Sequence, residues 1–208
     1  MPEMKNKSKI REYGETFVIA LLIALFVRAF VVQAFKIPSG SMEPTLLVGD
    51  HILVNKFIYG IRMPLVGKRL VTFTKPRRGD VIVFIYPRDR SKDFIKRVIG
   101  LEGEKVEIKG QKIYINDRPL EDAWGVYSHT SSLWGLPAKN NYGPHVVPSG
   151  CLFVLGGNRN NSQDSRSWGF VPINDVLGKA FISYWSWDWR APSLIYKVRW
   201  RRIGHVIR

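Results

Sequence analysis

Residues 94–115 read FIKRVIGLEGEKVEIKGQKIYI and decide the fold. Polar and apolar residues alternate in two runs, Lys105–Ile108 and Lys112–Ile115, which is typical of half-buried β-strands. The dipeptide Gly110-Gln111 lies between these runs and predicts a hairpin, and Asn116-Asp117 predicts a second turn. This stretch therefore predicts antiparallel β-structure.

Short apolar runs bounded by Gly, Pro and Asn continue this pattern through most of the chain. They are rich in Val, Ile and aromatic residues and have the length of strands, and they cover His51–Val54, Asp80–Tyr86, Cys151–Leu155 and Ala180–Tyr184. Helical periodicity is not evident after Phe35. The segment Glu121–Pro148 is rich in Gly, Pro, Ser and Asn and is expected to be an irregular excursion between strands. The predicted fold class is mostly β.

The segment Thr16–Phe35, TFVIALLIALFVRAFVVQAF, precedes the β-rich part. About 20 apolar residues suffice to span a bilayer as a helix. A buried core helix and a cleaved signal peptide are the alternatives, but Lys36-Ile37-Pro38-Ser39 is not a small-residue cleavage site. We therefore expect residues 1–15 to be a cytoplasmic N-terminus, 16–35 a retained transmembrane anchor, and 36–208 one β-rich domain outside the cytoplasm, in agreement with the basic residues before the anchor.

The composition restricts the chemistry. The chain has 208 residues and a net charge of +15, which indicates an anionic partner such as nucleic acid or an anionic membrane. Its single cysteine, Cys151, excludes an intrachain disulfide, and the histidines show neither catalytic pairing nor metal-ligand spacing. We expect no metal and no cofactor.

Three segments carry residues suited to nucleophilic chemistry. The first is PSGSMEPTL, Pro38–Leu46, in which two serines flank a glycine; alone, it would be an ordinary turn. The second contains Lys96 in an apolar strand, where a lysine is either a surface residue or a desolvated base with a lowered pKa. The third is the polar run Gly156–Gly169, in which Asp164 and Arg166 could form a fixed ion pair.

Together and in this order, these segments resemble bacterial type I signal peptidases, also called leader peptidases. The resemblance is carried by PSGSMEPTL directly after the anchor, RGDVIVF at Arg78–Phe84, FIKRVIGLEGE at Phe94–Glu104, GGNRNNSQDSRSWGFVP at Gly156–Pro172, and RWRRIGHVI at Arg199–Ile207. It implies an antiparallel β-sheet or barrel catalytic domain behind one transmembrane helix. It also implies a membrane-bound serine endopeptidase that removes signal peptides from exported preproteins after small residues (Ala-x-Ala).

The resemblance also implies roles for individual residues. Ser41 corresponds to the nucleophile, Lys96 to the general base, and Ser39 to the hydroxyl that helps to hold the oxyanion. Ser162 corresponds to the serine that orients the lysine. Asp164 and Arg166 correspond to the supporting ion pair, and the apolar residues of the substrate pockets correspond to Ile37, Met42, Leu46, Val83 and Ile95. The implied reaction proceeds through an acyl-enzyme.

The chain departs from the family pattern at three places. Gly157 and Asn160 stand where the family usually has aspartates, and Glu102-Gly103-Glu104 stands where it often has Pro-Gly-Asp. The Gly157 change removes a carboxylate near the predicted site.

Competing interpretations come from related and unrelated classes. Self-cleaving SOS repressors and conjugation-type peptidases also use Ser–Lys chemistry, but an SOS repressor would need a DNA-binding domain where this chain has an anchor. A membrane-tethered nucleic-acid binder would need a recognisable module, and none is found, so we expect no nucleic-acid partner. Anionic lipid fits the charge better, because Trp185, Trp187, Trp189 and Trp200 lie near arginines; filling the core is the alternative role for these tryptophans. The sequence does not define an oligomeric state.

Overall fold

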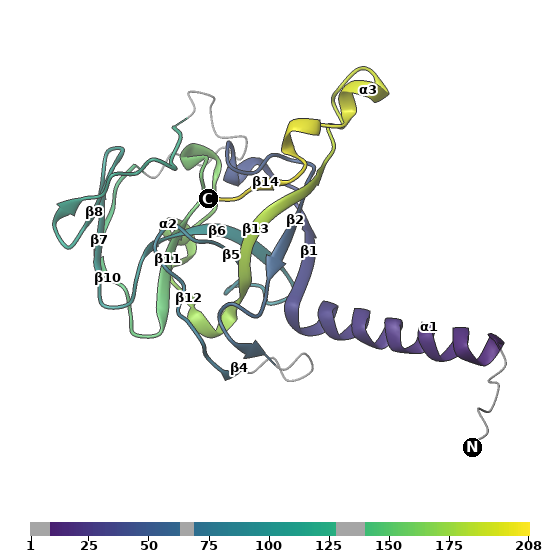
Figure 1. The fold of residues 1–208 in the computed structure, drawn as a ribbon. Helices are drawn as coiled ribbons and strands as arrows, with labels where there is room; N and C mark the ends of the chain where they lie inside the picture. The colour runs from purple at the N-terminus through teal and green to yellow at the C-terminus, as the bar shows by residue number, and fades with distance from the viewer. Residues whose placement is uncertain (1–8, 63–68, 128–139) are drawn as a thin grey trace.

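The computed structural model describes residues 9–62, 69–127 and 140–208. An N-terminal helix, α1 (Lys9–Phe26), continues as a π-helical turn, Val27–Val31, and projects from a body of β-sheets (Figure 1). The other helical elements are short. They are α2 (Ser165–Trp168), α3 (Leu194–Lys197) and the 3-10 turns Gly40–Met42, Arg159–Asn161, Ile173–Asp175 and Trp200–Arg202.

The strands form three antiparallel sheets in the described part of the chain. The large sheet has the order β1-β2-β13-β5-β6-β11-β12, with β14 beside β13; a second sheet has the order β10-β7-β8-β9, and β3 pairs with β4. The strand bounds are β1 Val32–Lys36, β2 Asp50–Asn55, β3 Ile61–Arg62, β4 Arg69–Val71, β5 Val81–Ile85, β6 Asp93–Gly100, β7 Lys105–Lys109, β8 Lys112–Ile115, β9 Arg118–Pro119, β10 Tyr142–Val146, β11 Cys151–Leu155, β12 Val171–Pro172, β13 Val176–Ser186 and β14 His205–Val206.

The predicted strands and turns are confirmed. Strands β7 and β8 pair through Lys109 and Lys112, so Gly110-Gln111 forms the hairpin turn. Asn116 and Asp117 both have positive φ, 51° and 66°, as expected for a tight turn with the right-handed twist of a hairpin. The mostly β fold class is confirmed as well.

The interpretation of residues 121–148 as irregular is wrong for its last part. Residues 142–146 form β10, which pairs with β7 despite Gly143 and Pro144. Strand β10 lies at the edge of its sheet, where a proline without a donor N–H is tolerated. Residues 128–139 of the predicted excursion lie outside the described residues.

The helix of the anchor ends earlier than the sequence predicted, at Val31 rather than Phe35. Residues 32–36 form β1 instead, because they pair along their whole length with β2, from Val32 opposite Asn55 to Lys36 opposite His51. Lys56 also satisfies carbonyls in the last helical turn: its N–H donates to Val31 O, and its Nζ donates to Ala29 O.

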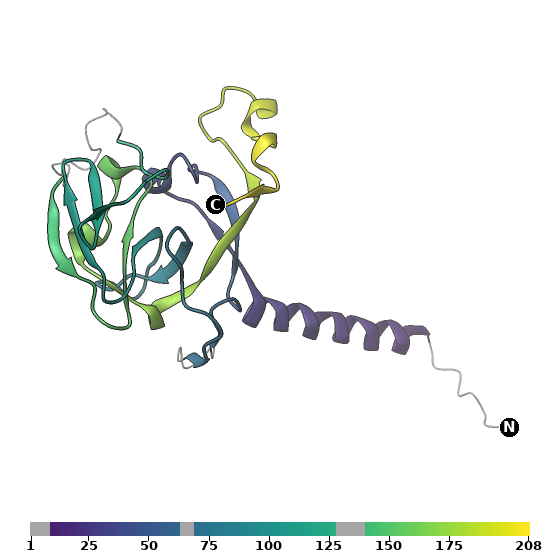
Figure 2. The same cartoon turned by 60° about the vertical axis from the view of Figure 1, so that its left-hand side comes forward.

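The N-terminal helical segment has the length and composition of a membrane span. Residues 11–31 are mostly apolar, and none of an 18-residue apolar window within them is buried against the rest of the structure. Such a continuous exposed apolar surface needs a cover, which a bilayer supplies. Figure 2 shows α1 pointing away from the sheets, so its apolar faces are open all round.

The sheets enclose three apolar clusters in the described residues. One of them places Met42 and Leu46 against Val83 and Ala180, and thereby joins the loop after β1 to β5 and β13. A second cluster lies around Phe84 and packs under β6 and β11. The third cluster supports the four-stranded sheet. The loop after β1 and strand β6 are thus both fixed by buried packing.

Candidate active site

The loop between β1 and β2 forms the first part of the site. Its ends are joined, because Ile37 N donates to Asp50 O over 2.8 Å and Gly49 N donates to Ile37 O over 3.0 Å. Between these ends lies the 3-10 turn Gly40–Met42, in which Ser41 is 8% exposed. Glycine beside the serine allows the backbone to turn tightly and present a hydroxyl.

Lys96 approaches that turn from strand β6. Its backbone pairs with Ile82 of β5, and its side chain is almost fully buried. The Lys96 Nζ lies 2.8 Å from Ser41 Oγ and donates to Ile95 O over 2.9 Å. The Phe94 ring lies on the same side, with its centroid 5.4 Å from Nζ. The structure therefore brings Ser41 and Lys96, which are 55 residues apart, into direct contact.

Burial changes the proton affinity of the amine. Desolvation lowers the pKa of Lys96 to about 8, and the Asp164 carboxylate partly opposes this by favouring the charged form. An amine with this pKa is neutral in a useful fraction of molecules near neutral pH. A neutral amine within hydrogen-bonding distance of a hydroxyl can accept its proton.

The segment after β11 carries a buried ion pair. Asp164 is fully buried and accepts two hydrogen bonds of 2.8 Å from Nε and Nη2 of Arg166. It also accepts from Gly156 N and from Arg166 N at the start of α2. The predicted Asp164–Arg166 pair is present, and it connects the end of β11 with α2.

The same segment contacts the backbone of Ser41 directly. Asn158 N donates to Ser41 O over 3.1 Å. The buried Arg159 donates to Gly156 O over 2.9 Å and pairs with Asp122 over 2.9 Å. Sequence reasoning missed the Asp122–Arg159 pair, although Arg159 lies within the quoted GGNRNNS motif.

The two auxiliary serines occupy different environments. Ser39 is exposed and lines the same cavity as Ser41 and Lys96. The Ser162 hydroxyl is buried and has no hydrogen-bond partner within the described part of the chain. It lies against Gly156, where a Cβ would come within 2.2 Å of Ser162 Oγ and 2.5 Å of Ser41 O. The predicted role of Ser162 in orienting Lys96 therefore stays a prediction.

The five predicted pocket residues lie in one apolar cluster. Four are buried and Ile95 is partly buried against them; the buried four are Ile37, Met42, Leu46 and Val83. They form part of the packed interior next to Ser41. None is among the residues that line the cavity described next.

An open cavity of about 900 Å³ lies over Ser41 and Lys96. Its walls combine the loop after β1, strand β6, the segment after β11 and the segment after β13. Residues not singled out from the sequence line it, including Glu43, Val48, Phe94, Asp188 and Arg199. Glu43, Phe94 and Arg199 lie in the quoted motifs but were not assigned a role in the site, and Val48 and Asp188 lie outside those motifs.

Gly157 packs against the backbone of the loop between β1 and β2, which carries Ser41. A Cβ at this position would lie 2.8 Å from Glu43 O, which is closer than Cβ atoms come in folded proteins, and 3.1 Å from Met42 O, which is tighter than most Cβ contacts. An aspartate, the usual family residue, therefore requires the two segments to move apart. Glycine at position 157 therefore allows the segment after β11 to lie closer to the loop between β1 and β2 than the usual aspartate would.

No metal-binding cluster of His, Cys, Asp or Glu occurs among the described residues. His51, His145 and His205 do not line the cavity in that part of the chain, and His129 lies outside it.

Comparison with known proteins identifies the family. The model of the family described as signal peptidase, peptidase S26, matches residues 10–185. A signal peptidase I from Pseudomonas fluorescens is 38% identical over 239 residues, covering 98% of this chain and 82% of the relative. One from Leptolyngbya laminosa is 39% identical over 189 residues, covering 87% and 82%. The solved structure of a signal peptidase I from Enterococcus faecalis is 36% identical, with a TM-score of 0.41, covering 52% of this chain and 98% of that one.

The Ser41 hydroxyl and the buried Lys96 amine are in contact on a β-sheet scaffold, an arrangement that also occurs in serine hydrolases without a catalytic histidine. The chain belongs to the signal peptidase family, peptidase S26, and as a member of it is a serine endopeptidase that acts on signal peptides. Its N-terminal apolar helix fits a membrane-anchored member.

Proposed function

We propose that the protein cleaves exported preproteins after small residues, at Ala-x-Ala sites, with Ser41 as nucleophile and Lys96 as general base. The contact of 2.8 Å between Ser41 Oγ and Lys96 Nζ carries this proposal, together with the burial of the lysine. Neutral Nζ takes the proton from Oγ while Oγ bonds to the scissile carbonyl carbon. The Ser41 N–H and the Ser39 hydroxyl hold the oxyanion.

The second half of the reaction returns the enzyme to its starting state. Protonated Lys96 gives its proton to the leaving amine as the peptide bond breaks, which leaves an acyl ester on Ser41. Lys96, again neutral, takes a proton from a water molecule that attacks this ester. The carboxylate product leaves, and Ser41 regains its proton. Ser162 and the Asp164–Arg166 pair support Lys96.

Two features support the substrate class. Strand β6 pairs with β5 at residues 93–97 but with β11 only from Arg97 onward, so in the described residues Phe94–Lys96 offers an edge to an extended peptide. The apolar cluster next to Ser41, with Ile37, Met42, Leu46, Val83 and Ile95, is tightly packed. These residues do not line the cavity over Ser41, but they fill the interior beside Ser41 and leave no space there for a bulky side chain.

The proposed location is the bacterial plasma membrane, crossed once. Basic residues precede the span, including Lys9 and Arg11, which favours a cytoplasmic N-terminus. The catalytic domain, residues 36–208, then lies on the outer, extracytoplasmic face. Exported preproteins meet the site there, where the apolar core of a signal peptide leaves the bilayer.

The decisive experiment compares three forms of the full-length protein in detergent, with a preprotein that bears one Ala-x-Ala site. Wild type is expected to cut after that site, and Ser41→Ala and Lys96→Met are expected to lose at least about 10³-fold in rate. N-terminal sequencing of the product verifies the site. Cleavage that persists in both variants would rule out the mechanism.

A lipid contact is proposed for the segment around α3. Trp189 and Trp200 are 65% and 66% exposed, and Arg190 and Arg201 are exposed beside them. Figures 1 and 2 both show α3 on the opposite side of the body from β7, β8 and β10, towards the side from which α1 projects. Exposed tryptophan and arginine together suit an anionic bilayer surface.

This contact is tested by thiol protection. In a Cys151→Ser background, Trp200→Cys is expected to react several times more slowly with a water-soluble thiol reagent in anionic vesicles than in detergent. Lys112→Cys, on the β7–β8 hairpin, serves as the control and is expected to react equally in both. Equal rates at residue 200 in both media would show that the segment stays in water.

A further inference from the structure

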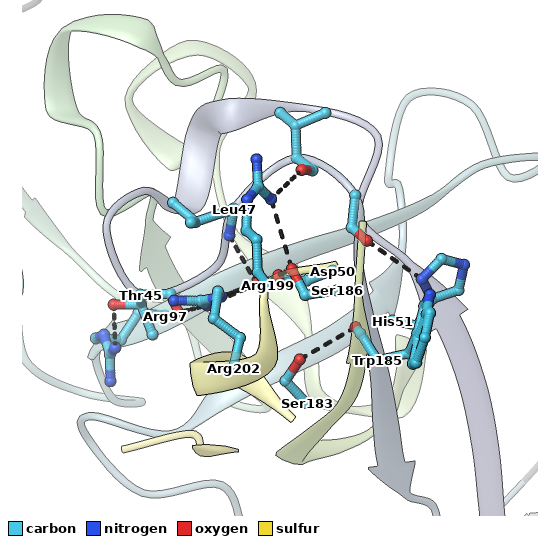
Figure 3. Close-up of polar contacts among 12 residues, drawn as sticks. Thr45, Leu47, Asp50, His51, Arg97, Ser183, Trp185, Ser186, Arg199 and Arg202 are labelled. Carbon is cyan, nitrogen blue, oxygen red and sulfur yellow. Dashed lines mark hydrogen bonds and ion pairs between the residues drawn. The ribbon is translucent and has the colours of Figure 1, made fainter. Parts of the chain in front are cut away.

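Two arginines hold Thr45, which lies four residues after Ser41. Arg202 Nη2 donates to Thr45 O over 2.9 Å, and Arg97 Nη2 donates to Thr45 Oγ1 over 3.1 Å (Figure 3). One arginine belongs to the segment after β13 and the other to β6, directly after Lys96. The two arginines thus contact the same residue from different parts of the fold.

Asp50 fixes the first of these arginines. Its carboxylate is fully buried and accepts from Arg202 Nε over 3.0 Å and Nη2 over 2.6 Å. It also accepts from Ser186 Oγ over 2.6 Å and from Leu47 N over 2.9 Å. Figure 3 shows these groups converging between the loop and β13. Asp50 therefore joins the end of the loop between β1 and β2, which carries Ser41, to β13 and to the segment that follows β13.

Arg199 extends the same network to the cavity. It donates to Val48 O over 2.9 Å and pairs with Asp188 over 2.8 Å. Arg199, Val48 and Asp188 all line the cavity above Ser41. The segment after β13 thus contacts the loop that carries Ser41. It also forms a wall of the cavity in which the proposed substrate would bind.

The two halves of the proposed catalytic pair are held in different ways. Lys96 belongs to a strand with a paired neighbour, so β5 fixes its backbone. Ser41 belongs to the loop between β1 and β2, and that loop is not part of any sheet in the described structure. Its turn is linked to Thr45 through the next residue, because Leu46 N donates to Met42 O over 2.9 Å. The position of Ser41 therefore depends on what fixes the middle of the loop.

We propose that Asp50 and Arg202 are positioning residues for the cleavage reaction, which set the place of Ser41 relative to Lys96 through Thr45. The proposal rests on the proposed Ser41–Lys96 chemistry. A buried ion pair adds little net stability over apolar packing, whereas its directional hydrogen bonds define geometry. Misplacement of a reacting group by about 1 Å can reduce a rate by about 10²-fold.

The test uses full-length protein and separates kcat from KM. Arg202→Lys keeps a positive charge opposite Asp50 but cannot reach both Asp50 and Thr45 O, because an ammonium group lacks the planar fork of a guanidinium. We expect kcat to fall by about 10–100-fold, with KM changed less than about threefold, which is under 1 kcal/mol. Thr45→Val removes only the Arg97 contact and is expected to have a smaller effect on kcat. Arg118→Lys, at an exposed arginine on β9, is the matched control.

Chemical rescue separates positioning from stability. Arg202→Ala leaves a space beside Asp50 that free guanidinium can enter, and millimolar guanidinium is expected to restore part of kcat. Guanidinium is a denaturant at higher concentration, so it cannot repair a variant that is only unstable. Arg118→Ala is expected to show no gain under the same conditions.

The outcomes distinguish this inference from the proposed function. If wild type cleaves and Ser41→Ala does not, the proposed function stands, and the Arg202 variants then test the network. A folded Arg202→Lys protein with wild-type kcat would overturn the inference. An Arg202→Ala protein with a lowered melting temperature whose kcat does not rise with guanidinium would overturn it as well. Cleavage by Ser41→Ala would instead refute the proposed function itself.

Discussion

Replacing Lys96 by methionine is expected to stabilise the folded protein at pH 7 while it abolishes cleavage. The buried amine has a pKa of about 8 in the folded protein, against 10.5 for a lysine in water. Below pH 8 the lysine is protonated in both states, and the folded state carries the full penalty of the buried charge. With about 1.4 kcal/mol for each pKa unit, this penalty is on the order of 3 kcal/mol. Lost hydrogen bonds to Ser41 and Ile95 reduce the gain to about 1–3 kcal/mol.

The pH dependence of this effect has a defined sign. Between pH 8 and 10.5 the unfolded chain binds a proton at Lys96 that the folded chain does not bind, so wild-type stability rises with pH in this window. Lys96→Met lacks this contribution. The difference between the two proteins should therefore be largest below pH 8 and should shrink towards pH 10.5.

Urea unfolding of wild type and Lys96→Met from pH 7 to 10.5 measures this difference. Lys112→Met, on the exposed side of β8, is the matched control and should leave stability within about 0.5 kcal/mol. A Lys96→Met protein that is less stable than wild type at pH 7 would show that the amine is not desolvated in the folded state.

The sequence predicted the sheet because its strands have local signals. Lys105–Lys109 and Lys112–Ile115 alternate, and Asn116-Asp117 takes the left-handed conformation that such residues tolerate. The end of the anchor could not be located in this way. Val32, Ala34 and Phe35 continue the apolar composition of the helix before them, and the pairing of residues 32–36 with β2, 15 or more residues later in the chain, makes them a strand.

The predicted site residues could be found from the sequence because each of them lies in a short motif that resembles the family. The quoted motifs contain Ser41, Lys96, Asp164 and Arg166, which are close in space. The motifs do not predict which of their residues form hydrogen bonds with residues elsewhere in the chain. The bond from Arg202 to Asp50 joins residues 152 positions apart, and although Arg202 lies in the quoted RWRRIGHVI motif, nothing local marks Asp50 as its partner. The fold brings these two residues together because β13 pairs with β2, and the segment after β13 then lies beside the loop between β1 and β2.

Replacing Asp164 by asparagine is expected to move the pH profile of cleavage to lower pH. The Asp164 carboxylate favours the protonated form of Lys96, so its loss lets the pKa of the lysine fall below about 8. The rate of cleavage rises as Lys96 loses its proton, and the midpoint of that rise in kcat/KM should follow the pKa of the lysine downward. Wild type is expected to show its midpoint near pH 8.

The same substitution removes the carboxylate that balances Arg166, whose side chain is 4% exposed. Taking one partner from a buried ion pair typically destabilises a protein by about 3–5 kcal/mol. Asp164→Asn combined with Arg166→Met removes both charges and should regain much of this stability, while the midpoint of the pH profile stays low because the carboxylate is still absent. A midpoint that returns to its wild-type value in the double variant would show that the shift came from loosened structure and not from the charge. A midpoint that moves upward in the single variant would contradict the electrostatic role of Asp164, since loss of a nearby negative charge can only make the protonated amine less favourable.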